Sequence, residues 1–248
     1  MTAAAQAWIA VGGAFLTAVL GLLKYFNYRS RRDRIALVGK EFSQVVDALS
    51  SEDELRKAAG AILLRRFFDR RSEMGSPRTP YEKEAVGVIA ALLRKVEPGD
   101  FQKLLADSLA YAPSLREADL QHCRLNGAYL GIRPGRRVDL SAADLFEADV
   151  TGASLKGARA QGTVFYRATL KRTVFEGADL READFRDADL EGAKFAGAVL
   201  AGAKFQGAKH VPGDVATMTG DDGTVPITRE RSRWLRRLRT VRPGPVSQ

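Results

Sequence analysis

Few residues of the chain belong to the types that commonly perform acid–base or nucleophilic chemistry. Its two histidines, His122 and His210, lie far apart in the sequence, and a single cysteine, Cys123, cannot form an intrachain disulfide. The sequence contains no HExxH zinc motif, no GxSxG nucleophile motif and no glycine-rich phosphate loop. Aspartate and glutamate recur at regular intervals after residue 113, so a pair of them does not indicate general acid–base catalysis. We predict no catalytic residue, no cofactor and no metal site, and hence no enzyme.

Basic residues are the better candidates for a functional site, and their surplus is concentrated at the two ends of the chain. The net charge is +9, which predicts an anionic neighbour such as lipid or nucleic acid. Residues 31–112 and residues 113–209 each carry 15 Lys or Arg against 13 Asp or Glu, so both blocks are nearly neutral. The excess therefore comes mainly from residues 1–30 and 210–248.

The C-terminal end combines arginines with apolar residues in the stretch RERSRWLRRLRTVR, residues 229–242. As a helix, this stretch would carry its apolar residues on one face with arginines around them, and such a helix can lie on anionic lipid. We predict contacts for five residues: Trp234, Leu235, Arg236, Arg237 and Leu238. Three alternatives stay open: a disordered tail, a helix that caps the preceding domain, and nucleic-acid binding, which the lack of interleaved aromatic residues disfavours.

At the N-terminus, residues 3–23 contain no charged residue, and about 20 residues in a helix reach roughly 30 Å, the thickness of a bilayer core. A secretory signal peptide carries its cations before the apolar run. The cations here follow it, at Lys24, Arg29, Arg31, Arg32 and Arg34. We therefore predict a single-pass, uncleaved anchor in the inner membrane, with everything after Lys24 in the cytoplasm. A buried helix of a soluble protein is the alternative, and Gly12 and Gly13 could pair two helices in a homo-oligomer.

The segment 31–112 carries apolar residues at helical spacing, interrupted by strong stop signals. Ser51 and Glu54 form a capping box that predicts a helix start. The apolar stripe of this helix consists of Leu55, Ala58, Ala59, Ile62, Leu63 and Phe67. A second helix start at Thr79-Pro80-x-Glu82 precedes the stripe Ala85, Val88, Ile89, Leu92, Leu93 and Val96. Pro98 and Gly99 end that helix, and Asp100 opens a short third one, so we expect a helical packing unit that caps the next domain.

Between Ser114 and Ala208 the sequence repeats with a period of five, which neither a helix nor a strand possesses. Steps of five from Leu115 to Phe205 give nineteen positions, of which sixteen are Leu or Phe. Two residues before these centres the chain usually has Ala, and the remaining positions are mostly polar or Gly. This regularity predicts a solenoid in which one large and one small side chain of each unit point inward.

The pattern A(D/N)LXX resembles the pentapeptide-repeat family, and the match suggests a membrane-anchored bacterial member. The resemblance implies a right-handed quadrilateral β-helix in which each five-residue unit forms one side of a square coil. Four sides make about twenty residues per coil, and neighbouring coils would lie about 4.8 Å apart. Steps of twenty then place Phe165, Phe185 and Phe205 in one stack and Phe175 and Phe195 in the opposite one. Cys123 falls on a small inward position and is expected to be an inert core thiol.

One segment breaks the rule. Residues 131–137 keep the count of five between Leu130 and Leu140 but place Arg133 where Ala belongs and Gly135 where Leu belongs. A bulged side or a projecting loop is implied. This segment is either a tolerated surface irregularity or a basic contact point, for which the candidates are Arg133, Arg136 and Arg137.

The chain is thus predicted to be an α+β protein of several parts. An anchor with its basic flank covers 1–30, a small helical domain 31–112, the pentapeptide-repeat β-helix 113–209, and a linker with a basic tail 210–248. The preferred function is a membrane-tethered scaffold or interaction module with an unidentified protein partner. The alternative, a DNA mimic that binds a topoisomerase as some family members do, requires an acidic rod. Only Glu176 to Glu191 is locally acidic, which disfavours mimicry.

Overall fold

A computed structural model describes residues 32–33, 35–69, 71–72, 74–75, 81–133, 136–217, 219–220 and 222–226. The chain divides into two compact units, residues 1–82 and 83–248. The predicted anchor, residues 3–23, and the predicted lipid-binding tail, residues 229–242, lie outside the described residues. Among the residues that the structure does describe, no helix is long and apolar enough to span a bilayer.

The first unit contains a helix over residues 35–49, then α2 (Glu54–Leu64) and the short 3-10 helix η1 (Arg65–Phe68). Asp53 caps α2 by accepting hydrogen bonds from the backbone N–H groups of Leu55 and Arg56. The predicted capping box is therefore wrong, because the N-cap residue of α2 is Asp53 and not Ser51. The hydroxyl of Ser51 instead accepts from the backbone N–H of Asp53, because the chain turns once more before the helix begins.

The buried face of α2 also differs from its apolar stripe. Leu55, Ile62 and Leu63 are exposed by 82%, 54% and 42%, whereas Gly60 and Ala61 are buried. A Cβ atom at Gly60 would lie 3.1 Å from the Leu49 side chain, so the small residues allow the helix over 35–49 to approach α2 closely. The buried face of α2 thus consists of Gly60, Ala61 and Leu64 instead of the predicted stripe.

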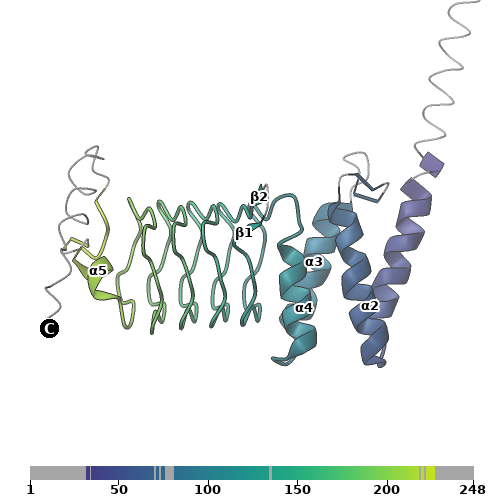
Figure 1. Ribbon diagram of the computed structural model, residues 1–248, viewed down its shortest axis with the longest axis horizontal. Helices are drawn as coiled ribbons and strands as arrows, with labels where there is room; N and C mark the ends of the chain where they lie inside the picture. The colour runs from purple at the N-terminus through teal and green to yellow at the C-terminus, as the bar shows by residue number, and fades with distance from the viewer. Residues whose placement is uncertain are drawn as a thin grey trace, which may run out of the picture. The chain divides into compact units, whose positions relative to one another are not determined.

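The second unit begins with α3 (Tyr81–Leu93), of which the first two residues belong to the first unit, and α4 (Asp100–Leu109). The division of the chain falls inside the segment 31–112 that the sequence suggested as one helical domain. The expected third helix at Asp100 is confirmed, and Figure 1 shows α3 and α4 at one end of a stack of coils. The proposed second helix start at Thr79 and Pro80 lies outside the described residues.

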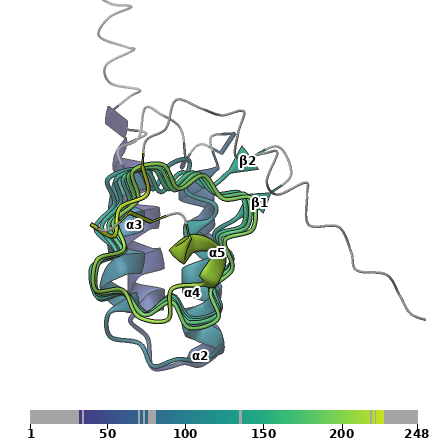
Figure 2. The same cartoon turned by 90° about the vertical axis from the view of Figure 1, so that its left-hand side faces the viewer.

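The coils form a four-sided β-helix. Backbone bridges join residues twenty apart in parallel, as in the column Asp144, Val164, Asp184 and Lys204. Viewed end-on, the coils lie behind one another (Figure 2). Each corner is a tight turn in which the carbonyl of one centre accepts from the residue three positions later, for example Leu140 from Ala143 at 2.9 Å. The residue two positions after a centre has positive φ, such as 67° at Gly152, which explains the recurring glycines.

The interior confirms the expected aromatic stacks. The rings of Phe165 and Phe185 stack at 5.0 Å and those of Phe185 and Phe205 at 4.9 Å between centroids. Phe175 and Phe195 stack at 5.0 Å and contact the first stack edge-on. The small inward residues are buried as well, and where Thr replaces Ala the hydroxyl is satisfied: Thr163 donates to the carbonyl of Leu140 at 2.8 Å. Packing therefore fills most of the described inward positions, while Ala118 and Ala198 are half-buried.

The first coil contains five more residues than the others. Its bridges join residues twenty-five apart, as between Asp119 and Asp144, whereas from Asp139 onward the spacing is twenty. Residues 131–137 supply the difference, because they leave the wall as an antiparallel hairpin of β1 (Ile132–Arg133) and β2 (Arg136–Arg137). Of the two expected forms of this irregularity, the projecting loop is confirmed and the bulged side is not formed.

The C-terminal end of the coil is partly closed by the chain that follows it. In α5 (Gly213–Ala216), Val215 is buried. Residue Thr224 pairs antiparallel with Lys204, and Val225 donates to the carbonyl of Ala203 at 2.9 Å. This closing segment covers the backbone edge of one side of the last coil.

Candidate interaction surface

The cysteine and the two histidines, the residue types most often found in catalytic and metal sites, do not form a common site. Cys123 is fully buried, its sulfur lies 3.5 Å from the carbonyl oxygen of Ala90 in α3, and burial raises the pKa of its thiol to about 11. His122 is exposed beside Glu147, and His210 lies 2.9 Å from Asp189. Within the described part of the chain, no cluster of His, Cys, Asp or Glu could hold a metal ion.

The aspartates of the repeat have a structural role. At the position before a centre, the carboxylate accepts a hydrogen bond from the backbone N–H two residues later, as Asp139 does from Ser141 at 3.0 Å and Asp144 from Phe146 at 2.9 Å. This local bond stabilises the turn at the end of the side. The recurrence of Asp therefore follows from the geometry of the coil.

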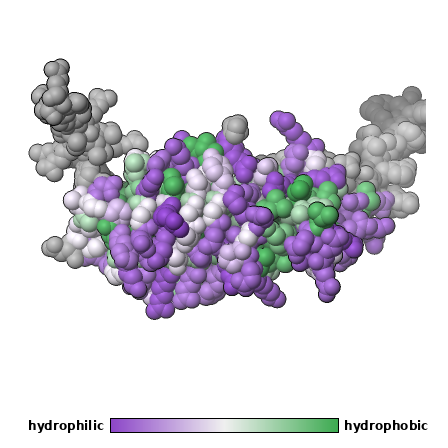
Figure 3. Space-filling model, turned by 60° about the horizontal axis from the view of Figure 1, so that its bottom comes forward, coloured by the Kyte–Doolittle hydropathy of each residue, from purple (hydrophilic) through white to green (hydrophobic). Residues whose placement is uncertain are grey.

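The locally acidic segment 176–191 is largely neutralised by its own neighbours. Five of its seven carboxylates pair with Lys or Arg; Arg181 contacts Asp179 at 2.5 Å and Arg186 contacts Asp184 at 2.6 Å. The hydrogen bond from Arg181 lowers the pKa of Asp179 below its ordinary value. Figure 3 shows a mostly hydrophilic face on the coil, without a large apolar patch.

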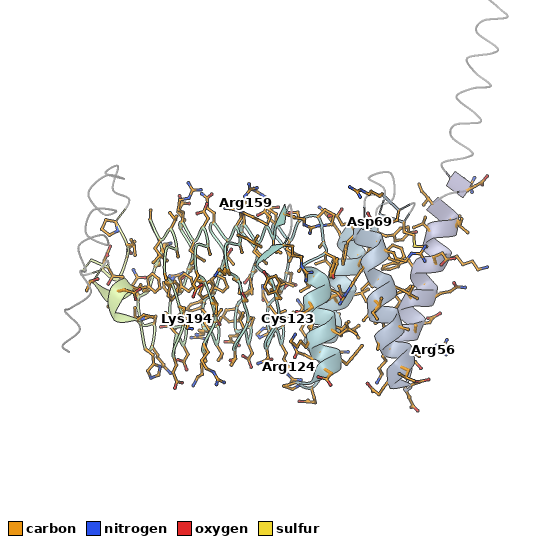
Figure 4. The ribbon with its side chains drawn as sticks, viewed as in Figure 1. Arg56, Asp69, Cys123, Arg124, Arg159 and Lys194 are labelled. Atoms are coloured by element: carbon orange, nitrogen blue, oxygen red, sulfur yellow. The ribbon has the colours of Figure 1, made fainter. Side chains whose placement is uncertain are left out.

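The helices α3 and α4 attach to the open end of the first coil by polar contacts. Arg124 donates to the carbonyl of Val96 at 2.6 Å, Gln102 to that of Arg124 at 2.7 Å, and Arg94 to that of Gln121 at 2.9 Å. Figure 4 shows Cys123 and Arg124 on the coil beside these helices. The two helices thus provide partners for backbone groups that a bare coil end would expose.

The hairpin is fixed to the C-terminal end of α4 by one of the predicted contact residues. The guanidinium of Arg136 donates to the carbonyls of Ala110, Tyr111 and Ala112. These carbonyls follow the last turn of the helix, where a cation is favoured by the helix dipole. Arg136 therefore has a structural role in holding the hairpin.

Arg133 lies on the same face of the hairpin as Arg136 but makes a different contact. Its guanidinium carbon is 4.4 Å from the ring centroid of Tyr111 and 5.5 Å from that of Tyr129. Its Nε atom is buried and has no hydrogen-bond partner among the described residues. Two aromatic rings therefore hold this cation without satisfying that donor.

The opposite face of the hairpin carries Ile132 and Arg137, which form a register pair. Ile132 packs over Gly157, where an added Cβ would meet the isoleucine Cδ1 at 2.2 Å, and its N–H donates to Lys156 at 2.9 Å. Arg137 is exposed. We call the surface made by Arg133, Tyr111 and Tyr129 on the first face the hairpin patch.

The sequence identified Arg133 of this patch but not its two tyrosines. Tyr111 and Tyr129 are exposed by 37% and 39%. Tyr129 occupies an outward position of its repeat unit, where most units have a small or polar residue, and this anomaly could have indicated it. Tyr111 gave no such signal, because its proximity to the hairpin depends on how α4 meets the coil. The other predicted contact residues, Trp234 to Leu238, lie outside the described residues.

These features define a four-sided β-helix of the protein-interaction type, capped by helices and carrying one projecting hairpin. A family model for pentapeptide repeats matches residues 139–177 and 178–209 with eight copies. The chain is a pentapeptide-repeat protein. Proteins of this family are generally structural or interaction modules.

Solved structures of similar proteins cover only parts of the chain. Rfr23 from the cyanobacterium Cyanothece 51142 is 24% identical over 38% of this chain and 56% of its own, with a TM-score of 0.31. The chain thus spans about half the length of that relative. The pentapeptide-repeat protein alr5209 from Nostoc Pcc 7120 is 32% identical over 36% of this chain and 77% of its own, with a TM-score of 0.29. QnrB1, a plasmid-mediated fluoroquinolone resistance protein, is 16% identical over 38% of this chain and 62% of its own, with a TM-score of 0.23. No curated protein gives a match.

Proposed function

We propose that the chain is a non-catalytic interaction module that is tethered to the cytoplasmic face of a membrane by its N-terminal segment. In this proposal the pentapeptide-repeat coil is a rigid support and the hairpin patch is its contact surface. The C-terminal basic tail adds a second contact with anionic lipid.

The composition of the hairpin patch is the observation that carries the interaction role. Tyrosine and arginine are enriched at the centres of protein interfaces, where rigid side chains lose little entropy on binding. The patch exposes two tyrosines beside the guanidinium of Arg133, and the hairpin that carries Arg133 is fixed by Arg136 and by the close contact of Ile132 with Gly157. Elsewhere on the coil, many outward charges pair with one another, as Lys171 does with Glu191 at 2.8 Å. The patch is therefore the best-supported contact surface.

The tether rests on the sequence. Twenty-one uncharged residues, 3–23, precede a cluster of cations, as expected for an anchor that keeps its basic flank in the cytoplasm. Carbonate washing of membranes should leave the full chain in the pellet and release a shortened chain that begins at Arg31. Recovery of the full chain in the soluble fraction would exclude the tether.

The interaction role is tested by cross-linking in membranes. A photo-activated amino acid at position 137, next to the patch, should give a discrete cross-linked product with another protein. The same amino acid at Arg172, an exposed position on a different side of the coil, is the matched control. Equal products from both positions, or none from either, would argue against a contact surface at the hairpin.

DNA mimicry is the alternative, and the charge distribution disfavours it. A duplex carries about one negative charge per 1.7 Å, whereas the carboxylates of residues 176–191 are mostly paired with cations. The protein should leave supercoiling by DNA gyrase unchanged. Strong inhibition at stoichiometric amounts would favour mimicry over the proposed module.

A further inference from the structure

The most unusual side chain of the hairpin patch is Arg133, because its position is fixed by stacking rather than by hydrogen bonds. Its guanidinium lies over the ring of Tyr111 and near that of Tyr129, and Tyr129 is itself held by a hydrogen bond to the carbonyl of Ile132. Arg133 is half-buried, and its buried Nε donor has no partner among the described residues. This arrangement contrasts with Arg136 on the same hairpin face, which donates to three carbonyls.

A stacked arginine of this kind is suited to receive an anion. Stacking holds the plane of the guanidinium, whereas its N–H groups point along the edge of that plane. A planar carboxylate can accept two parallel hydrogen bonds from such an edge, and a charge-assisted pair of this geometry is stronger than a neutral one. Because the rings already restrict the side chain, little rotamer entropy remains to be lost on binding.

We propose that Arg133 is the receptor for a carboxylate side chain of an acidic protein segment, which docks on the hairpin patch. Tyr111 and Tyr129 contact the apolar residues that flank this carboxylate. Arg137, exposed on the opposite face of the hairpin, adds a more distant and weaker positive charge.

The surroundings favour a protein segment over a phosphate-rich surface. Binding to anionic lipid or nucleic acid relies on clusters of several unpaired cations. Several cations near the hairpin already pair with acids: Lys156 pairs with Glu176 at 3.0 Å, and Lys103 pairs with Asp107 at 3.3 Å. The two exposed tyrosines instead provide the apolar contact area typical of a protein interface.

This inference rests on the proposed function, since it names the chemistry of the partner that the module would hold. The two can fail separately. If the cross-link at position 137 forms equally well in the Arg133→Gln protein, the interaction role stands and the carboxylate receptor is refuted.

A defined peptide provides the direct test. The full chain, purified in detergent, is titrated against the fluorescein-labelled peptide EELEEYEELEE, and binding is followed by fluorescence anisotropy. We expect Arg133→Gln to weaken binding at least ~10-fold, because it removes a charge-assisted hydrogen-bond pair. Arg133→Lys should weaken it as well, since lysine keeps the charge but lacks the planar fork.

Three controls decide between the alternatives. Arg172→Gln removes the same charge from a different side of the coil and should leave binding unchanged. The peptide with Gln in place of every Glu should not bind, and inorganic polyphosphate should not compete at equal charge. The proposal is overturned if neither peptide binds, if both bind equally, if Arg172→Gln weakens binding as much as Arg133→Gln, or if polyphosphate displaces the peptide. The midpoint of thermal unfolding is measured for Arg133→Gln as a control, and a value equal to that of the wild type shows that the variant is folded.

Discussion

The coils after Leu140 and the hairpin at residues 131–137 have the same five-residue spacing in the sequence but follow different paths in the structure. After Leu140, each group of five residues forms one side of the coil, and residues twenty apart pair. At the hairpin, the coil contains five additional residues, and residues twenty-five apart pair between neighbouring coils. The spacing of the sequence is therefore the same, whereas the path of the chain is not.

The difference shows what keeps a unit in the wall. A regular unit supplies a central inward side chain and a small one two positions earlier, and most of these are buried in the coils after Leu140. The hairpin unit offers Arg at the small position and Gly at the large one, so it has nothing to bury. Its polar groups find partners outside instead, at the end of α4. Core filling thus decides whether five residues form a side.

The largest expected effect comes from breaking a stack in the regular wall. Phe185 is fully buried between Phe165 and Phe205, so Phe185→Ala should lower the free energy of unfolding by about 3–5 kcal/mol. Phe146→Ala is the matched control, because Phe146 points outward and contacts Tyr166 on the surface. Its loss should be nearer ~1 kcal/mol. Urea unfolding measures both, and equal losses would contradict the inward stacking.

The second effect tests how the hairpin is held. Arg136→Gln removes a cation that donates to three carbonyls after α4, and should lower the free energy of unfolding by about 1.5–3 kcal/mol. Arg137→Gln, one residue later and exposed, should change it by less than ~0.5 kcal/mol. Urea unfolding compares the two neighbours. Similar values for both would show that the contact with α4 does not stabilise the protein.

A smaller effect concerns the corners of the regular coils. Ala142 has a φ of 55°, which costs an L-residue roughly 1 kcal/mol and glycine almost nothing. We expect Ala142→Gly to raise the free energy of unfolding by up to ~1 kcal/mol. Ala201 also lies in the coil but does not have a positive φ, so Ala201→Gly should lower the free energy of unfolding by about 0.5–1 kcal/mol. If thermal unfolding shows the same sign for both, the turn assignment is wrong.

The smallest effect is a dependence on pH. The hydrogen bond from Arg181 lowers the pKa of Asp179 in the folded state, so its stabilisation is present above the ordinary carboxyl pKa and is lost as the pH falls through the folded value. The free energy of unfolding should therefore drop below about pH 4. Asp179→Asn should make this drop shallower, and Arg181→Gln should do so to a similar extent. A double variant whose acid response equals that of each single variant would confirm that the two side chains act as one pair.

The regular wall could be predicted from the sequence residue by residue. The positions of Phe165, Phe175 and Phe185 follow from counting, because each side has the same length and its contacts recur at a fixed offset of twenty. The inward cysteine and the turn glycines follow from the same count. The buried face of α2 could not be predicted in this way, because it depends on a non-periodic contact, the close approach of Gly60 to Leu49.

By itself, the sequence determined that a solenoid with five-residue units exists, which side chains fill it and where its regularity is interrupted, and its resemblance to the pentapeptide-repeat family implied the four sides. Only the tertiary structure decided that the interruption is a hairpin held by Arg136 and that Arg133 lies against Tyr111 and Tyr129. The physical reason is the range of the contacts involved. The wall depends on a local repeat that imposes its own geometry, whereas the hairpin patch depends on where the end of α4 meets the coil, and no periodic pattern encodes that meeting.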